Sequence, residues 1–245
     1  MTLRPEDRFS VTVDDYAARR PSYPLPFVDA LVGALAVPPG ARAVDLGAGT
    51  GISTRLFAAR GLTGLVGVEP NAAMRAAAEP GTPLVDGTAE ALPFEPRSVH
   101  AALAAQSFHW FRHDEALDAL AAALVPGGRL AIVWNLRDAS PLMDAYEAWL
   151  ERLESYRVVP RFPEVRARVE QDPRVRLELR LEAPHTQRFD RAGFIGRARS
   201  SSYVAHAERP WSALEPELHA LFDAHVRAGE VTFAYRAVAS VVRFA

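Results

Sequence analysis

Short apolar runs alternate along the first half of the chain with segments whose apolar side chains recur at helical spacing. This alternation is typical of a parallel sheet whose strands are joined by crossover helices. The apolar runs predict strands over residues 44–46, 65–69, 83–86, 99–106 and 129–135. The segments between them predict helices over residues 24–36, 52–59, 71–79 and 114–125. The last helix is expected to stop at Pro126, Gly127 and Gly128.

The pattern changes after Asn135. Ser140 followed by Pro141 indicates the start of a helix, because serine caps a first turn and proline is tolerated within it. An apolar stripe at helical spacing continues that helix through Leu142, Tyr146, Trp149 and Leu153. Apolar and charged residues then alternate over 175–182, which predicts a strand with one face in water. We also expect helices over residues 190–200 and 212–227 and a closing antiparallel strand over residues 231–244.

A glycine-rich turn joins the first predicted strand to the helix after it. The segment 43–51 reads Ala-Val-Asp-Leu-Gly-Ala-Gly-Thr-Gly. Its glycines lack Cβ atoms, so the chain can turn sharply and bring the free N–H groups of the next helix to a nucleoside cofactor. In the dinucleotide fingerprint the second and third glycines are three positions apart, whereas Gly49 and Gly51 are two apart. Asp45, which precedes the turn, suits a cationic ligand better than a pyrophosphate.

Polar groups also follow the next three predicted strands. Glu69 ends the second strand, where a carboxylate can accept hydrogen bonds from both ribose hydroxyls or simply cap the following helix. The segment 86–94 follows the third strand and offers polar side chains and a backbone N–H where an adenine edge would lie. The fourth strand ends at residues 106–110, beside the switch point where open α/β sheets bind ligands.

These segments, in this order and spacing, resemble the class I S-adenosylmethionine-dependent methyltransferases over roughly the first half of the chain. The segments from Tyr16 to Pro24 and from Gln106 to Phe111 are similar to the small-molecule branch called methyltransferase type 11, to which trans-aconitate methyltransferases are distantly related. The segment from Phe194 to Tyr203 is similar to a substrate-side segment of that branch. Residues 154–184 match no segment of this family.

The resemblance implies an α/β fold with a Rossmann-like, doubly wound sheet of seven strands, mostly parallel with an antiparallel last strand, plus a helical substrate cap. It implies a single domain over residues 1–245. Within it we expect an N-terminal lid over residues 1–23, a cofactor-binding core over 24–136, substrate-covering elements with the sixth strand over 137–230, and the closing strand over 231–245.

The resemblance also implies S-adenosylmethionine as the cofactor. Gly47 and its neighbours would then wrap the methionine part, Asp45 would orient its ammonium through water or backbone, and Glu69 would hold the ribose. Ala89 would offer its N–H to the adenine. The complete set of implied cofactor-binding residues is Asp45, Gly47, Ala48, Gly49, Gly51, Glu69, Pro70, Thr88, Ala89, Glu90, Gln106, Tyr16 and Arg20.

The chain departs from the family at Thr88, where many of these enzymes have an aspartate that binds the adenine amino group. That contact would fall here to the Thr88 hydroxyl, to Asp86 or to a backbone carbonyl.

The transfer of a methyl group from a sulfonium is an in-line displacement with a good leaving group, so alignment and desolvation supply most of the catalysis. A carboxylate acceptor is already ionised at neutral pH, whereas a phenol, an amine or a carbon acid must lose a proton. His109 is the leading candidate for that base. Alternatively, His109 and Trp110 pack a helix N-terminus or close the pocket.

Aromatic and basic residues are candidates for contacts with the acceptor. Tyr16 and Tyr23 either fold over the cofactor as a lid or anchor the leader to the core. An anionic acceptor would suit a bidentate arginine, and Arg199 is preferred because serines and Tyr203 follow it. The other arginine candidates are Arg20, Arg137 and Arg197. The predicted acceptor-binding set is Tyr23, Ser107, Trp110, Arg199 and Tyr203.

Composition excludes several other classes. All 28 basic residues are arginine, so Schiff-base chemistry and a P-loop lysine are absent, and the net charge of -2 gives no field that attracts nucleic acid. The chain has no cysteine, and its histidines lack metal-site spacing, so we expect no metal. No apolar run could cross a bilayer, and residues 1–15 lack a secretion-signal core. We expect a cytoplasmic monomer or homodimer without membrane or nucleic-acid partners.

The sequence therefore predicts an enzyme that transfers a methyl group from S-adenosylmethionine to a small-molecule acceptor, with a carboxylate or hydroxyl as the acceptor group. One alternative is an NAD-dependent oxidoreductase on the related sheet, against which the glycine spacing and Asp45 argue. The other is a non-catalytic protein that binds S-adenosylmethionine.

Overall fold

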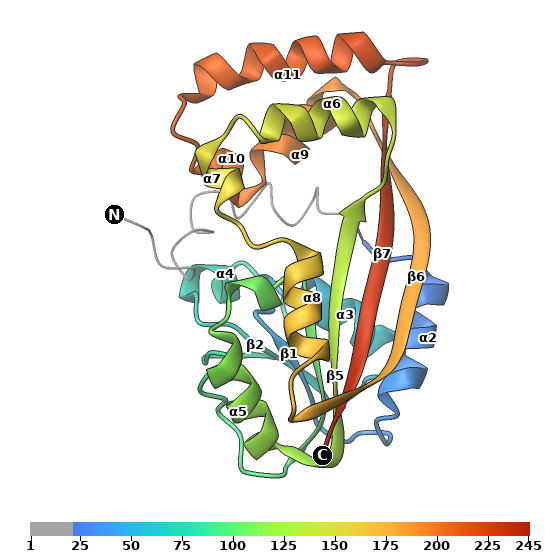
Figure 1. The fold of residues 1–245 in the computed structure, drawn as a ribbon, viewed down its shortest axis with the longest axis vertical. Coiled ribbons are helices and arrows are strands. Elements are labelled where there is room, and N and C mark those ends of the chain that lie inside the picture. Colours follow the sequence, from blue (N-terminus) through green and yellow to red (C-terminus); the bar gives the residue numbers. More distant parts are fainter. Residues whose placement is uncertain (1–21) are drawn as a thin grey trace. The chain divides into compact units, whose positions relative to one another are not determined.

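The computed structural model describes residues 22–245. Figure 1 shows the order of the helices and strands along the chain. They are α2 (Leu25–Leu35), β1 (Ala43–Leu46), α3 (Ile52–Ala59), β2 (Leu65–Val68), α4 (Ala72–Ala76), β3 (Leu84–Val85), β4 (Val99–Ala105), the 3-10 helix η2 (Phe108–Trp110), α5 (His113–Ala123), β5 (Leu124–Arg137), α6 (Pro141–Leu150), α7 (Glu154–Arg157), α8 (Phe162–Glu170), β6 (Val175–Phe189), α9 (Arg191–Arg199), α10 (Ser202–Ala205), α11 (Trp211–His225) and β7 (Val231–Phe244).

The strands form one sheet of seven in the order β3-β2-β1-β4-β5-β7-β6. The pairs β1–β2, β2–β3, β1–β4 and β4–β5 are parallel. β7 runs opposite to β5, as Figure 1 shows. This order confirms the prediction of a Rossmann-like sheet that is mostly parallel with an antiparallel last strand. The chain passes from β1 toward β3 on one side and returns to β4 on the other, so the switch point lies between β1 and β4.

The described residues divide into two compact units. The sheet unit comprises residues 23–134, 160–183 and 237–245, and the helical unit comprises residues 22, 135–159 and 184–236. The division falls inside β5, β6 and β7. The predicted partition into core, covering elements and closing strand stays a prediction, and residues 1–21 of the expected lid lie outside the described residues.

The core of the sheet unit forms where α2 and α3 meet one face of the strands. α2 buries Phe27, Leu31 and Leu35, which recur every four residues and so share one side of the helix. They belong to one cluster with Phe57 of α3 and with Leu103 of β4. The packing of α2 and α3 on this face holds β1 and β4 in place, and with them the strand ends that carry the site.

The core of the helical unit forms around α6, which begins where the sequence predicts. The Ser140 hydroxyl oxygen accepts a hydrogen bond from the Met143 N–H at 3.2 Å and caps the first turn. The apolar stripe of α6 buries Tyr146, whose ring centroid lies 6.0 Å from that of Phe194 and 5.2 Å from that of Phe233. Leu153 is buried as well, but it lies beyond the end of α6 at Leu150.

Several predicted boundaries are wrong for physical reasons. β5 begins at Leu124, directly after α5, and pairs with Val99 before the register shifts by several residues to the pair Ala101–Arg129. Residues 126–128 therefore interrupt a ladder instead of separating a helix from a strand, because proline donates no hydrogen bond and Gly127 has a φ of 74°. α4 is shorter than predicted and β6 is longer. The short helices α7, α8 and α10 were not predicted.

Candidate functional site

The glycine turn between β1 and α3 has the backbone that its sequence predicts. Gly47, Gly49 and Gly51 have φ angles of 64°, 60° and 76°. A Cβ atom on Gly47 would lie 2.8 Å from the Ser107 Cβ, and one on Gly51 would lie 2.4 Å from the Thr82 Cγ2. A Cβ atom on Gly49 would meet nothing within 4 Å. Gly49 therefore borders open space, where a ligand can approach the backbone closely.

The turn is fixed to the end of β2. The N–H groups of Gly47 and Ala48 both donate to the Val68 carbonyl, at 2.9 and 3.1 Å. The Gly51 N–H donates to the Ala48 carbonyl at 2.9 Å and closes the loop before α3. Ala48 itself is buried. The turn is thus formed by protein contacts alone.

Glu69 connects this turn to α4. Its Oε2 accepts from the Gly49 N–H and its Oε1 from the Asn71 N–H, each at 2.9 Å. Burial raises the pKa of Glu69, and the hydrogen bonds from Asn71 and Gly49 offset only part of that rise. The predicted ribose contact and the helix-cap alternative are compatible, because each carboxylate oxygen has a second lone pair. Pro70 separates Glu69 from Asn71, whose side chain caps α4.

Asp45 lies in β1 and is completely buried. Its Oδ2 accepts from the hydroxyls of Ser53 at 2.6 Å and Thr54 at 2.8 Å, in the first turn of α3. Its Oδ1 has no hydrogen-bond partner among the described residues. Burial raises the pKa of Asp45 to about 6, the two hydroxyls lower it, and the charge of Glu69 raises it. A buried acid with one unpartnered oxygen fits a cationic ligand, as the sequence predicts.

The segment after β3 forms a tight turn. The Ala91 N–H contacts both the hydroxyl oxygen of Thr88, at 3.1 Å, and its carbonyl, at 3.3 Å. Ala89 is buried within this turn. Glu90 accepts from the Arg112 N–H at 2.8 Å, directly before α5. The Thr88 hydroxyl oxygen accepts this hydrogen bond, and its O–H is still able to donate one. Its contact with adenine therefore stays a prediction.

Arg75 was not predicted as part of this region. Its Nη1 donates to the Glu69 carbonyl at 2.6 Å and to the Asp86 carboxylate at 2.8 Å. It thereby joins the polypeptide after β2 to the polypeptide after β3. Asp86, an alternative partner for adenine, already forms an ion pair with Arg75.

The loop after β4 contains backbone strain beside the glycine turn. Gln106 has a φ of 60°, which a non-glycine residue adopts at an energetic cost. Its N–H donates to the Val133 carbonyl at 2.8 Å. The hydroxyl of the next residue, Ser107, donates to the Leu46 carbonyl at 2.6 Å, so this loop is locked to the end of β1. Nothing in the sequence indicates that strain.

His109 and Trp110 lie in an aromatic stack within η2. The His109 ring centroid is 4.5 Å from that of Trp110 and 5.3 Å from that of Trp134. Trp134 in turn lies 4.9 Å from Phe162 of α8. These contacts correspond to the packing alternative, and the role of His109 as a base stays a prediction. Trp134 is a neighbour that the sequence did not reveal.

Among the predicted leader residues, only Tyr23 is described. It is buried, and its ring centroid lies 6.0 Å from that of Phe27 and 6.3 Å from that of Phe57. These contacts correspond to the anchor alternative. Tyr16 and Arg20 lie outside the described residues.

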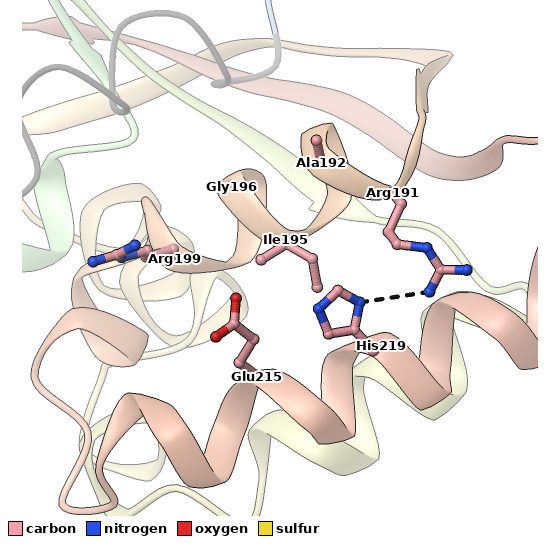
Figure 2. A pocket seen from close by; sticks show the side chains of 7 residues that line it. All are labelled: Arg191, Ala192, Ile195, Gly196, Arg199, Glu215 and His219. Atoms are coloured by element: carbon pink, nitrogen blue, oxygen red, sulfur yellow. Dashed lines mark hydrogen bonds between the residues drawn. The ribbon is translucent and has the colours of Figure 1, made fainter.

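The two acceptor candidates of the helical unit have different surroundings. Arg199 is exposed, with its guanidinium 5.1 Å from the Trp211 ring centroid. It lines a hollow of about 460 Å³ between α9 and α11, and Figure 2 shows Arg199 at one end and Arg191 at the other. Tyr203 instead accepts a hydrogen bond from Arg137 at 3.3 Å. Arg137 itself is already paired with Glu147, at 2.6 Å.

Within residues 22–245, no group of three His, Cys, Asp or Glu side chains is arranged to hold a metal ion. None of the helices in this range has the length and apolar character needed to cross a bilayer.

Three kinds of known protein resemble the chain: a protein family, curated relatives and solved structures. Residues 44–132 match a family model described as a methyltransferase domain, Methyltransf_11. Over 133 residues the chain is 44% identical to an uncharacterized methyltransferase of Mycobacterium tuberculosis and 36% identical to an uncharacterized methyltransferase-like protein of Schizosaccharomyces pombe. These matches cover 53% of this chain and 53% and 52% of the relatives, so the chain spans about half the length of the relatives it matches.

Solved structures share the fold over most of the chain. A protein from Anaeromyxobacter dehalogenans, solved as a candidate type II methyltransferase, superposes with a TM-score of 0.71 and 24% identity over 93% of this chain and 98% of that one. A geranyl diphosphate methyltransferase in complex with S-adenosylmethionine superposes with a TM-score of 0.50 and 19% identity, over 88% of this chain and 84% of that one. The glycine turn, Asp45 and Glu69 all fall inside residues 44–132, the segment that matches the Methyltransf_11 methyltransferase-domain model.

Proposed function

We propose that this protein binds S-adenosylmethionine at the glycine turn and transfers its methyl group to a small-molecule acceptor, with a carboxylate or hydroxyl as the acceptor group. One observation carries the proposal: a buried acid with an unpartnered oxygen, Asp45, and a buried acid bonded to the turn, Glu69, flank a glycine that borders open space. The family match and the complex of a structural neighbour with this cofactor support it.

Each part of the site has a role that follows from its chemistry. When bound, S-adenosylmethionine supplies an electrophilic methyl group on a sulfonium. Asp45 holds the positive charge of its amino-acid part, Glu69 accepts from the ribose hydroxyls, and Gly49 leaves room for the ligand. The rigid loop after β4 orients the polar side chain of Gln106. These roles bind and align the cofactor, which is most of what an in-line displacement requires.

A base is needed only when the acceptor is a hydroxyl. His109 would then take the proton from the acceptor oxygen onto an imidazole nitrogen. For such an acceptor, His109→Gln should lower the rate of transfer by about 10²- to 10⁴-fold and leave cofactor binding unchanged. For a carboxylate acceptor, which is already ionised, the rate should change little.

Calorimetry of the purified protein with S-adenosylmethionine and with S-adenosylhomocysteine tests the cofactor directly. We expect saturable binding of both. If neither binds at millimolar concentrations, the proposal fails. Transfer of a labelled methyl group to small molecules of a cell extract then separates an enzyme from a protein that only binds the cofactor. NADH should show no saturable fluorescence enhancement, because two adjacent acids are unsuited to a pyrophosphate.

A further inference from the structure

Arg197 of α9 is a buried cation without a counter-ion. Arg197 is only 6% exposed, and its Nη1 donates a hydrogen bond to the Ser201 hydroxyl at 3.0 Å. Its Nε–H has no acceptor, and no carboxylate of residues 22–245 forms an ion pair with it. An unpaired buried charge is costly to a folded protein, and buried polar groups are nearly always hydrogen-bonded. An anion bound at Arg197 would therefore neutralise the buried charge.

Two tyrosine hydroxyls next to Arg197 also lack acceptors. The hydroxyls of Tyr146 and Tyr235 are buried and donate to no acceptor in the described part of the chain. Burial lowers the pKa of Arg197, but the neighbouring Tyr235, Tyr203 and Tyr146 raise it by more. Burial also raises the pKa of Tyr146, so its hydroxyl keeps a proton to donate. The Nε–H of Arg197 and the hydroxyls of Tyr146 and Tyr235 are thus three buried polar groups without a hydrogen-bond acceptor in the described part of the chain.

The charges around Arg197 define the ligand as a monoanion. The nearby guanidinium of Arg137, 5.9 Å from the Tyr146 ring centroid, is neutralised by Glu147 at 2.6 Å. His185 stacks on Tyr235, and burial lowers its pKa, so it is uncharged at neutral pH. One positive charge remains, which matches one carboxylate and not a phosphate dianion.

The side chains packed around Tyr146 and Tyr235 are aromatic. Phe194 lies one helical turn before Arg197, and its ring centroid is 6.0 Å from that of Tyr146 and 5.6 Å from that of Phe233. An apolar or aromatic ligand body suits such rings, while a planar guanidinium suits the two oxygens of a carboxylate.

We propose that Arg197, with the hydroxyls of Tyr146 and Tyr235, binds the carboxylate of a small monoanionic ligand with an apolar or aromatic body. All of these residues belong to the helical unit, so the binding site does not depend on the placement of the two units. That the ligand is the methyl acceptor is a corollary, which rests on the proposed function and names the acceptor class as monocarboxylates.

Calorimetry without cofactor tests the site, with benzoate and phenylacetate as probes and their neutral amides as matched controls. We expect saturable binding of at least one acid at millimolar concentrations and none of its amide. Arg197→Gln should weaken that binding by about tenfold or more, because it removes a charge-assisted bidentate contact. The control Arg188→Gln, on an exposed ion pair of β6 with Glu230, should leave it unchanged.

Tyr146→Phe provides a second test of the site if the Arg197→Gln protein does not fold. It removes a hydroxyl that has no partner, so the unliganded protein should be at least as stable in thermal unfolding while acid binding weakens several-fold. A merely structural hydroxyl would not combine these two effects.

Three results would overturn the proposal: no binding of either acid to the folded wild-type protein, equal binding of acid and amide, or a loss of acid binding in Arg199→Gln while Tyr146→Phe binds normally. The third result would assign the acid to the hollow between α9 and α11. Binding of S-adenosylmethionine, measured on the same samples, is independent of these outcomes and reports separately on the proposed function.

Discussion

The carboxylate of Glu69 accepts a hydrogen bond from the backbone N–H of Gly49 at 2.9 Å, although the two residues lie 20 positions apart in sequence. The acid after β2 therefore fixes the part of the glycine turn that borders open space. Its other oxygen caps the entry to α4 through the Asn71 N–H. One buried group thus combines a structural role with a place beside the proposed ligand.

Glu69→Gln should damage both roles. The amide cannot accept from both N–H groups, because one of its two ends is a donor, so the free energy of unfolding should fall by about 1–3 kcal/mol. Affinity for S-adenosylmethionine should fall by about tenfold or more, since charge-assisted bonds are lost. Urea unfolding and calorimetry measure the two effects. The exposed Glu95→Gln should change neither; a Glu69→Gln protein of normal affinity would contradict the assignment.

Alanine substitutions at the three glycines should affect stability and cofactor affinity to different extents. Gly47→Ala and Gly51→Ala combine a positive φ with contacts below 3 Å, so each should destabilise the protein by about 3 kcal/mol or more. Gly49→Ala has only the backbone strain, which costs of order 1 kcal/mol. Its methyl group enters the open space, so affinity for S-adenosylmethionine should fall more than stability does. Equal losses of stability at all three positions would refute this distinction.

Asp45 should give the protein a pH-dependent stability. Its folded pKa, about 6, lies above the ordinary aspartate pKa of 3.8, so the folded state binds the proton more tightly than the unfolded state. Stability from this group is therefore full below about pH 4 and is lost as the pH rises through 6, by up to about 3 kcal/mol. Asp45→Asn should remove that part of the slope. Urea midpoints for both proteins between pH 4 and 7 measure it, and parallel curves would contradict the prediction.

The ion pair of Arg137 and Glu147 is partly buried, with 21% and 31% of the two side chains exposed. Glu147→Gln leaves the Arg137 guanidinium without its carboxylate and should cost about 1–3 kcal/mol. The double variant Arg137→Met with Glu147→Leu should recover most of the loss, because no charge is then stranded. Thermal unfolding of the single and double variants tests this, and additive losses would show that the residues do not interact.

The parts of the fold that the sequence predicted have local signals. Ser140 with Pro141 marks the first turn of α6, and the glycines at 47, 49 and 51 mark a turn that few other residues tolerate. The helices α7 and α10 are only four residues long, too short for an apolar period to show. The strain at Gln106 arises from tertiary contacts and has no sequence signature.

The burial of Arg197 has a signal in the sequence of α9. Arg197 and Arg199 lie two positions apart on α9, which places them on nearly opposite sides of the helix. Phe194 and Ala198 mark the buried side, and Arg197 lies three residues after the first and beside the second. The preference for Arg199 rested on the serines that follow it. Helical geometry favours Arg197 as the buried cation instead.

The burial of Asp45 has a further consequence for any cationic ligand. A positive charge that settles beside its free oxygen lowers the pKa of this acid, so near pH 6 each binding event should expel about half a proton to the solvent. Apparent affinity would then climb with pH across that range, and the heat of binding would depend on the ionisation enthalpy of the buffer. Although Asp45 is buried, the binding of a cationic ligand beside it would thus be measurable as protons released to the solvent.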